Sequence, residues 1–308
     1  MSDGAGGGAR AGVGGAGGAG GGASAGGAGG QPVAGQPRQP VVPRRSASLL
    51  LVRDDPLRVL MLRRGSSRGA FPSALVFPGG VLEPSDAGLA AGHVARRGAA
   101  GAGVAGRAAA GRAVAPPDEA ASLRVAAIRE AWEEVGVLLA RDASDSHLAG
   151  SAVPTPVAAG AGGLAGVLDA AGARLALEDV VPFGRWITPI GGKRRFDTDF
   201  FLARAPEGQE PTADGVEAVA IRWVRPAEVP DLRSELLLLP TLMNLRRLGS
   251  FASVAEAIAG APRFPREPVT PTVSIGDDGT PVVRIPAAAG YGVTEFFPQD
   301  PGHFKLEG

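Results

Sequence analysis

The sequence contains no cysteine among its 308 residues, and it has only three histidines and one tyrosine. Disulfides, thiolate metal sites and cysteine nucleophiles are therefore excluded. The three histidines are too few for a histidine-rich metal site. The 31 basic and 31 acidic residues give a formal net charge of zero. This balance argues against a general nucleic-acid binder, although a nucleotide or another small anion remains compatible with it.

Long apolar runs are also missing. None approaches the roughly 18 residues of a membrane span, and the N-terminus lacks the charged start and apolar core of a signal peptide. We therefore expect a cytoplasmic protein with no membrane partner and no nucleic-acid partner. The sequence leaves open whether the protein forms a homodimer.

Glycine and proline are abundant but unevenly placed. The chain has 48 glycines and 27 prolines, and 17 of the glycines fall within the first 40 residues. Residues 1–40 have almost nothing to bury, so we expect a disordered Gly/Ala-rich tail. We expect the main domain over 41–262. Residues 84–117 lack an apolar period and are expected to form an inserted loop. The extension 263–308 contains a hairpin signal around Gly-Asp-Asp-Gly.

Short apolar runs alternate with longer helical patterns, which indicates an α/β fold. The clearest helix is predicted over Asp118–Val135, where apolar residues recur every fourth position. Asp118 is a plausible N-cap, and Gly136 is a natural left-handed stop. A second helical pattern covers Leu164–Leu177. Strands are predicted at Ala47–Arg53, Arg58–Arg64, Ala74–Phe77, Gly184–Thr188, Arg195–Ala203 and Ala218–Val224.

The predicted helix ends in an acidic cluster. Glu130, Glu133 and Glu134 stand at i, i+3 and i+4, so they share roughly 100° of the helix surface. The plain alternative is an exposed acidic face with an Arg129–Glu133 ion pair. However, anions are disfavoured at a helix C-terminus, and like charges one turn apart repel. A divalent cation would reverse both effects, and carboxylate oxygens are the ligands that Mg²⁺ and Mn²⁺ prefer.

A glycine turn, Phe77-Pro78-Gly79-Gly80, precedes this helix in the chain. Together the two segments resemble the signature of the Nudix hydrolases, G-x5-E-x7-R-E-U-x-E-E-x-G-U. The second half matches at every fixed position, from Arg129 to Val137, and the first half matches at Gly80. The resemblance implies an α/β/α sandwich with a mixed sheet, and hydrolysis of a phosphoanhydride bond.

The resemblance also implies roles for individual residues. Glu130, Glu134 and the Gly80 carbonyl would bind Mg²⁺ or Mn²⁺, with Glu133 as a further candidate ligand. Glu133, Glu134 and Arg129 would be the catalytic residues. One more carboxylate often comes from a later part of the chain in this family, and Asp214 and Glu217 are the candidates.

The sequence departs from the family pattern between the two halves. The family places a Glu eight residues before the Arg, where this chain has Ala121. Gly80 and Arg129 are 49 residues apart instead of 14, so an insertion splits the motif. Asp86, Asp118 and Glu119 are candidates for the missing acid. A Nudix-like ligand sensor without catalysis is the alternative that Ala121 favours.

An insertion after Phe-Pro-Gly-Gly is similar to the acyl-CoA diphosphatase branch of the family. That likeness implies a CoA-type or other nucleoside-diphosphate substrate; ADP-ribose and NADH are the alternatives. A neutral protein must meet such a polyanion with local positive charge. Arg64, Arg68, Arg194 and Arg195 are the candidate phosphate contacts, because arginine suits phosphate geometry. Solvated strand-end and loop charges are the plain alternative for these residues.

Overall fold

The computed structural model describes residues 41–65, 71–101, 118–156, 160–191 and 194–297. The strands are β1 (Arg44–Arg53), β2 (Arg58–Arg64), β3 (Leu75–Val76), β4 (Gly79–Val81), β5 (Ala140–Arg141), β6 (Arg174–Leu175), β7 (Val181–Ile187), β8 (Phe196–Arg204), β9 (Ala218–Val224), β10 (Thr272–Ile275), β11 (Pro281–Arg284) and β12 (Glu295–Phe296). The α-helices are α1 (Pro84–Gly101), α2 (Glu119–Val135), α4 (Gly163–Ala170), α5 (Leu239–Leu248) and α6 (Val254–Gly260). The 3₁₀ helices are η2 (Gly150–Ala152), η3 (Gly160–Gly162), η4 (Leu177–Asp179), η5 (Pro226–Ser234), η6 (Ala261–Arg263) and η7 (Ala287–Ala289).

The central element is a mixed sheet of seven strands. Its main path runs β3-β2-β1-β8-β7, while β4 pairs with β1 and β9 pairs with β2. The pair β1–β8 is parallel, and every other pair in this sheet is antiparallel. The mixed sheet expected from the sequence is therefore confirmed.

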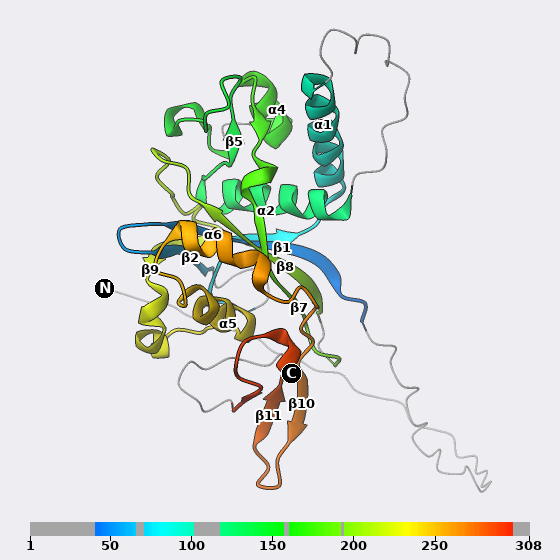
Figure 1. Ribbon diagram of the computed structural model, residues 1–308, viewed down its shortest axis with the longest axis vertical. Coiled ribbons are helices and arrows are strands. Elements are labelled where there is room, and N and C mark those ends of the chain that lie inside the picture. Colours follow the sequence, from blue (N-terminus) through cyan, green and yellow to red (C-terminus); the bar gives the residue numbers. More distant parts are fainter. Residues whose placement is uncertain (1–40, 66–70, 102–117, 157–159, 192–193, 298–308) are drawn as a thin grey trace, which may run out of the picture. The chain divides into compact units, whose positions relative to one another are not determined.

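Helices cover both faces of this sheet (Figure 1). Successive side chains of a strand point to opposite faces. Accordingly, Leu49 and Leu51 pack in one core with α2 residues, whereas Leu50 and Val52 pack in a second core with α5 residues. The α/β/α arrangement is confirmed by this alternation. The second core also contains Val283 from the C-terminal extension.

The helix that carries the acidic cluster forms as predicted. Asp118 is its N-cap and accepts a hydrogen bond from the Ala120 amide. Gly136 adopts the left-handed conformation at φ 71°, and its amide bonds the carbonyls of Ala131 and Trp132. A side chain at this φ would be strained, so glycine fixes where the helix stops.

Two local predictions are wrong. Residues 84–101 of the expected inserted loop form helix α1, which lies beside α2 (Figure 1), and 102–117 lie outside the described residues. The helical pattern over Leu164–Leu177 ends early, because α4 stops at Ala170 and the chain then forms β6 and η4. The predicted hairpin in the extension is confirmed as β10–β11.

Among the described residues, none of the helices is long and apolar enough to cross a membrane.

Candidate active site

The glycine turn is fastened directly to the acidic helix. β4 pairs antiparallel with β1, which places Gly79 opposite Ser48 and Gly80 opposite Ala47. The Gly79 amide donates to Glu134 Oε2 at 2.9 Å. A Cβ atom on Gly80 would overlap the Glu130 carboxylate, so only glycine allows this approach. The close approach sets both carboxylates against the backbone of the turn.

Arg129 organises the rest of the cluster. Its guanidinium is buried and donates from Nη1 to Glu130 Oε1 and to Glu133 Oε2, both at 2.8 Å. The pairing with Glu133 expected from the i, i+4 spacing is thus present. Nη2 reaches the Val81 carbonyl at 3.0 Å, which ties α2 to β4. Arg129 therefore holds the rotamers of two carboxylates and links the two halves of the motif.

The remaining donors of Arg129 identify the acid that the motif seemed to lack. Nε and Nη2 of Arg129 bind the two oxygens of Asp86 at 2.8 and 3.1 Å, and Asp86 is fully buried. Asp86 Oδ2 also accepts from the Glu83 amide at 2.8 Å, in the first turn of α1. The other two candidates act elsewhere, since Asp118 caps α2 and Glu119 pairs with Arg45.

Asp86 stands six residues after Gly80, the spacing of G-x5-E. Counting eight residues back from Arg129 led to Ala121 because the insertion lies between Asp86 and Arg129. Counting forward from Gly80 would have found the acid from the sequence alone.

Burial sets the electrostatics of the carboxylates. Burial raises the pKa of Glu130 to about 7, and Arg129 opposes that rise. Burial and then the charge of Glu130 raise the pKa of Glu134 to about 8, against the Gly79 amide and Arg64. Burial also raises the pKa of Glu133, again against Arg129. Without a further cation, the ionised forms of Glu130 and Glu134 are costly here.

This donor set fits a hard divalent cation. Within the described part of the chain, no group of three or more His, Asp or Glu side chains is arranged to hold a metal by itself. Mg²⁺ is usually bound by one or two carboxylates together with waters and substrate phosphates. The carboxylates of Glu134, which is buried, and of Glu130, which is partly buried, lie beside the glycine turn and match that requirement.

The later carboxylates occupy different positions. Glu217 is exposed, and its charge contributes to the raised pKa of both Glu130 and Glu134. Asp214 instead accepts backbone hydrogen bonds from the residues of its own turn, including a 2.7 Å bond from the Ala218 amide. Asp214 is thus part of the turn, while the exposed Glu217 adds negative charge that raises the pKa of the acidic pair.

The four arginines that are candidate phosphate contacts also differ in burial and in hydrogen-bond partners. Arg64 is half-buried, and its positive charge lowers the pKa of Glu134. Arg195 is buried, and its guanidinium donates to the carbonyls of Thr188, Pro189 and Val41. These bonds favour a bracing role for Arg195. Arg194 is exposed, and Arg68 lies outside the described residues.

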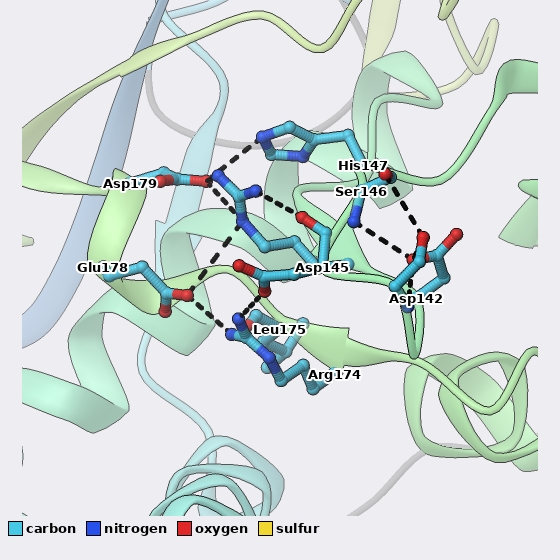
Figure 2. Close-up of polar contacts among 10 residues, drawn as sticks. Asp142, Asp145, Ser146, His147, Arg174, Leu175, Glu178 and Asp179 are labelled. Carbon is cyan, nitrogen blue, oxygen red and sulfur yellow. Dashed lines mark hydrogen bonds and ion pairs between the residues drawn. The ribbon is translucent and has the colours of Figure 1, made fainter.

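A second charged cluster joins β5, β6 and η4 (Figure 2). Asp179 Oδ2 lies 2.7 Å from Arg141 Nη2 and 3.1 Å from His147 Nε2. Arg174 pairs with Glu178 and Asp145 in the same cluster. The arginines here have acidic partners, so the cluster braces the β5–β6 ribbon.

Comparisons with known proteins agree with this geometry. The family model described as the NUDT19 Nudix domain matches residues 34–248. Acyl-coenzyme A diphosphatase NUDT19 of Homo sapiens is 33% identical over 242 residues, which cover 65% of this chain and 62% of that protein. Putative nudix hydrolase 7 of Caenorhabditis elegans is 28% identical over 190 residues, 61% of this chain and 53% of that protein. The chain thus spans less than two thirds of the length of these two relatives.

A solved structure supports the fold as well. A NUDIX hydrolase from Alicyclobacillus acidocaldarius superimposes with a TM-score of 0.56 at 29% identity, covering 71% of this chain and 96% of that one. The resemblance found in the glycine turn and the acidic helix is confirmed by these matches.

Proposed function

Because the chain belongs to the Nudix family, in the group described as the NUDT19 Nudix domain, we propose that it is a metal-dependent Nudix hydrolase. Its reaction is hydrolysis of a phosphoanhydride bond in a nucleoside diphosphate linked to another moiety. The observation that carries the proposal is the pair of Glu134, which is buried, and Glu130, which is partly buried, set against Gly79 and Gly80.

Glu130, Glu134 and the Gly80 carbonyl would hold Mg²⁺ or Mn²⁺, with Glu133 nearby. The bound ion would neutralise phosphate charge and activate the attacking water. The protein's own contribution is positioning. Arg129 holds Glu130 and Glu133 in fixed rotamers, and Asp86 holds Arg129.

We propose CoA or an acyl-CoA as the substrate. The printed names of the human and Gallus gallus NUDT19 relatives describe acyl-coenzyme A diphosphatases, which supports this choice. Among the candidate phosphate contacts we favour Arg64, because its charge lowers the pKa of Glu134. ADP-ribose and NADH are the competing substrates.

The alternative of a ligand sensor without catalysis depended on the acid missing at Ala121. Asp86 supplies a buried carboxylate to Arg129, so that argument no longer favours the sensor.

The test is a product assay with a substrate panel. The wild-type protein with Mg²⁺ should hydrolyse CoA or an acyl-CoA with a higher kcat/KM than ADP-ribose or NADH. Glu134→Gln should remove most of the activity, while Glu210→Gln, which changes an exposed acid on the β8–β9 connection, should retain it. Full activity of Glu134→Gln at saturating Mg²⁺ would refute the assignment. A preference for ADP-ribose would refute the CoA assignment alone.

A further inference from the structure

The connection between β8 and β9 is attached to the C-terminus of the acidic helix. The Thr212 amide donates to the Val135 carbonyl at 2.9 Å, and the Asp214 amide donates to the Glu134 carbonyl at 3.1 Å. Carbonyls in the last turn of a helix have no partner within the helix, so this segment satisfies two of them. Glu134 is thus held at both ends, its carboxylate by Gly79 and its backbone by Asp214.

The carboxylate of Asp214 shapes the turn that follows. Asp214 Oδ1 accepts from the amides of Val216 and Glu217, both at 3.1 Å, and from the Ala218 amide at 2.7 Å. Asp214 Oδ2 accepts from the Glu217 amide at 3.1 Å. Aspartate side chains commonly organise turns by bonding backbone amides a few residues on. Here three consecutive amides converge on one side chain.

The other contacts of the turn leave it little freedom. Gly215 adopts a φ of 79°, which suits glycine, and its amide bonds the Ala218 carbonyl at 2.9 Å. The Gly65 amide donates to the Glu217 carbonyl at 2.9 Å, next to the β2–β9 pairing of Arg64 with Ala218. The backbone of Glu217 is therefore fixed from Asp214 on one side and from β2 on the other.

We propose that Asp214 is a positioning residue, whose carboxylate shapes the 214–218 turn that carries Glu217 and is bonded to the last turn of the acidic helix. Asp214 makes no contact with substrate or metal in this assignment. The inference rests on the proposed function, since it assigns Glu217 to the same site.

Two substitutions separate positioning from direct participation. Asp214→Asn keeps an Oδ1 acceptor for the three amides but removes the charge. Asp214→Ala removes the acceptor altogether. A positioning role predicts that Asn retains activity and Ala does not. A ligand or proton acceptor would lose its function in both variants.

The kinetic experiment compares these variants with the wild type on the best substrate with Mg²⁺. Asp214→Ala should lower kcat by about ten- to a hundred-fold, because misplacing a group by about 1 Å has effects of that order. KM should stay within about threefold, because the phosphate contacts are not altered. Asp214→Asn should stay within about threefold of wild-type kcat, Glu217→Gln should be at least as impaired as Asp214→Ala, and Glu210→Ala is the matched surface control.

A second measurement, hydrogen exchange, does not depend on catalytic activity. Hydrogen exchange of the metal-free protein should show faster exchange at the 216–218 amides in Asp214→Ala and unchanged exchange in Asp214→Asn. Thermal unfolding midpoints should confirm that all variants are folded. Equal loss of activity in the Asn and Ala variants overturns the inference, and so does wild-type kcat or unchanged exchange in Asp214→Ala. Failure of the proposed function appears separately, as full activity of Glu134→Gln.

Discussion

The raised pKa values of the acidic pair predict that the metal-free protein loses stability as the pH rises. The pKa of Glu134 is about 8 and that of Glu130 about 7 in the folded state, against a usual value of 4.5. Between about pH 4.5 and 8, the unfolded chain therefore binds fewer protons than the folded protein at these groups. Stability must fall with rising pH across that window and level off above it.

The magnitude follows from the same values. For Glu134 the difference is 8 − 4.5 = 3.5 pH units. One unit corresponds to about 1.4 kcal/mol, which sets an upper bound of about 5 kcal/mol for this group. The two carboxylates repel each other, so their contributions are shared and do not add. We expect a total loss of about 2–5 kcal/mol between pH 5 and 8.

Urea unfolding in the presence of EDTA measures this loss. The free energy of unfolding of the wild-type protein and of Glu134→Gln is measured at pH 5 and at pH 8. The difference between the two proteins in the loss from pH 5 to pH 8 isolates the contribution of the Glu134 carboxylate. The variant should show a smaller loss, since it cannot ionise at that position. Mg²⁺ at a hundred times its dissociation constant should restore about 2.7 kcal/mol to the wild type at pH 8. Identical pH dependence of the two proteins would refute the reasoning.

Three further predictions concern the contacts around the pair. Gly80→Ala places a methyl group against the Glu130 carboxylate, so metal titration should show affinity weaker by about tenfold or more, with secondary structure by circular dichroism unchanged. Asp86→Ala leaves Arg129 buried with one partner fewer, and urea unfolding should show a loss of about 3–5 kcal/mol. Arg64→Ala should raise KM for a CoA substrate by about tenfold with a smaller effect on kcat in steady-state assays, since a charge-assisted phosphate contact is lost.

Local signals predicted the acidic helix well. Asp118 and Gly136 mark its two ends by backbone chemistry that operates within a few residues, so they could be recognised without knowledge of the fold. The i, i+4 pairing of Arg129 with Glu133 is local in the same sense. The distant bonds of Arg129 to Asp86 and Val81 use Nε and Nη2, which leaves Nη1 for the local bond to Glu133.

Helix α1 could not be predicted in this way. Its sequence contains Gly88 and Gly92, which weaken a helix, and it has no regular apolar stripe. What stabilises it comes from elsewhere in the chain: Asp86 bonds Arg129, and Ala90 is buried in the core that α2 shares. Such contacts join residues about 40 positions apart, and no local pattern reports them.

The pairing of the strands could not be predicted from the sequence either. β1 and β8 pair in parallel over nine residues, from Arg44 with Phe196 to Val52 with Arg204. Apolar runs predicted that both segments are strands, but not that they are neighbours. The hydrogen bonds that Arg195 donates depend on this pairing too, because one of its acceptors is the carbonyl of Val41, just before β1.

The position of Asp86 has a consequence for how this chain tolerates change. The contacts described between the two halves of the motif join Gly79, Val81 and Asp86 to Arg129 and Glu134, and none of them uses a residue between Asp86 and Arg129. Doubling the length of a flexible connection costs only about 0.6 kcal/mol. Added chain length between α1 and α2 therefore leaves these contacts in place, and a module inserted there need not alter the residues of the site.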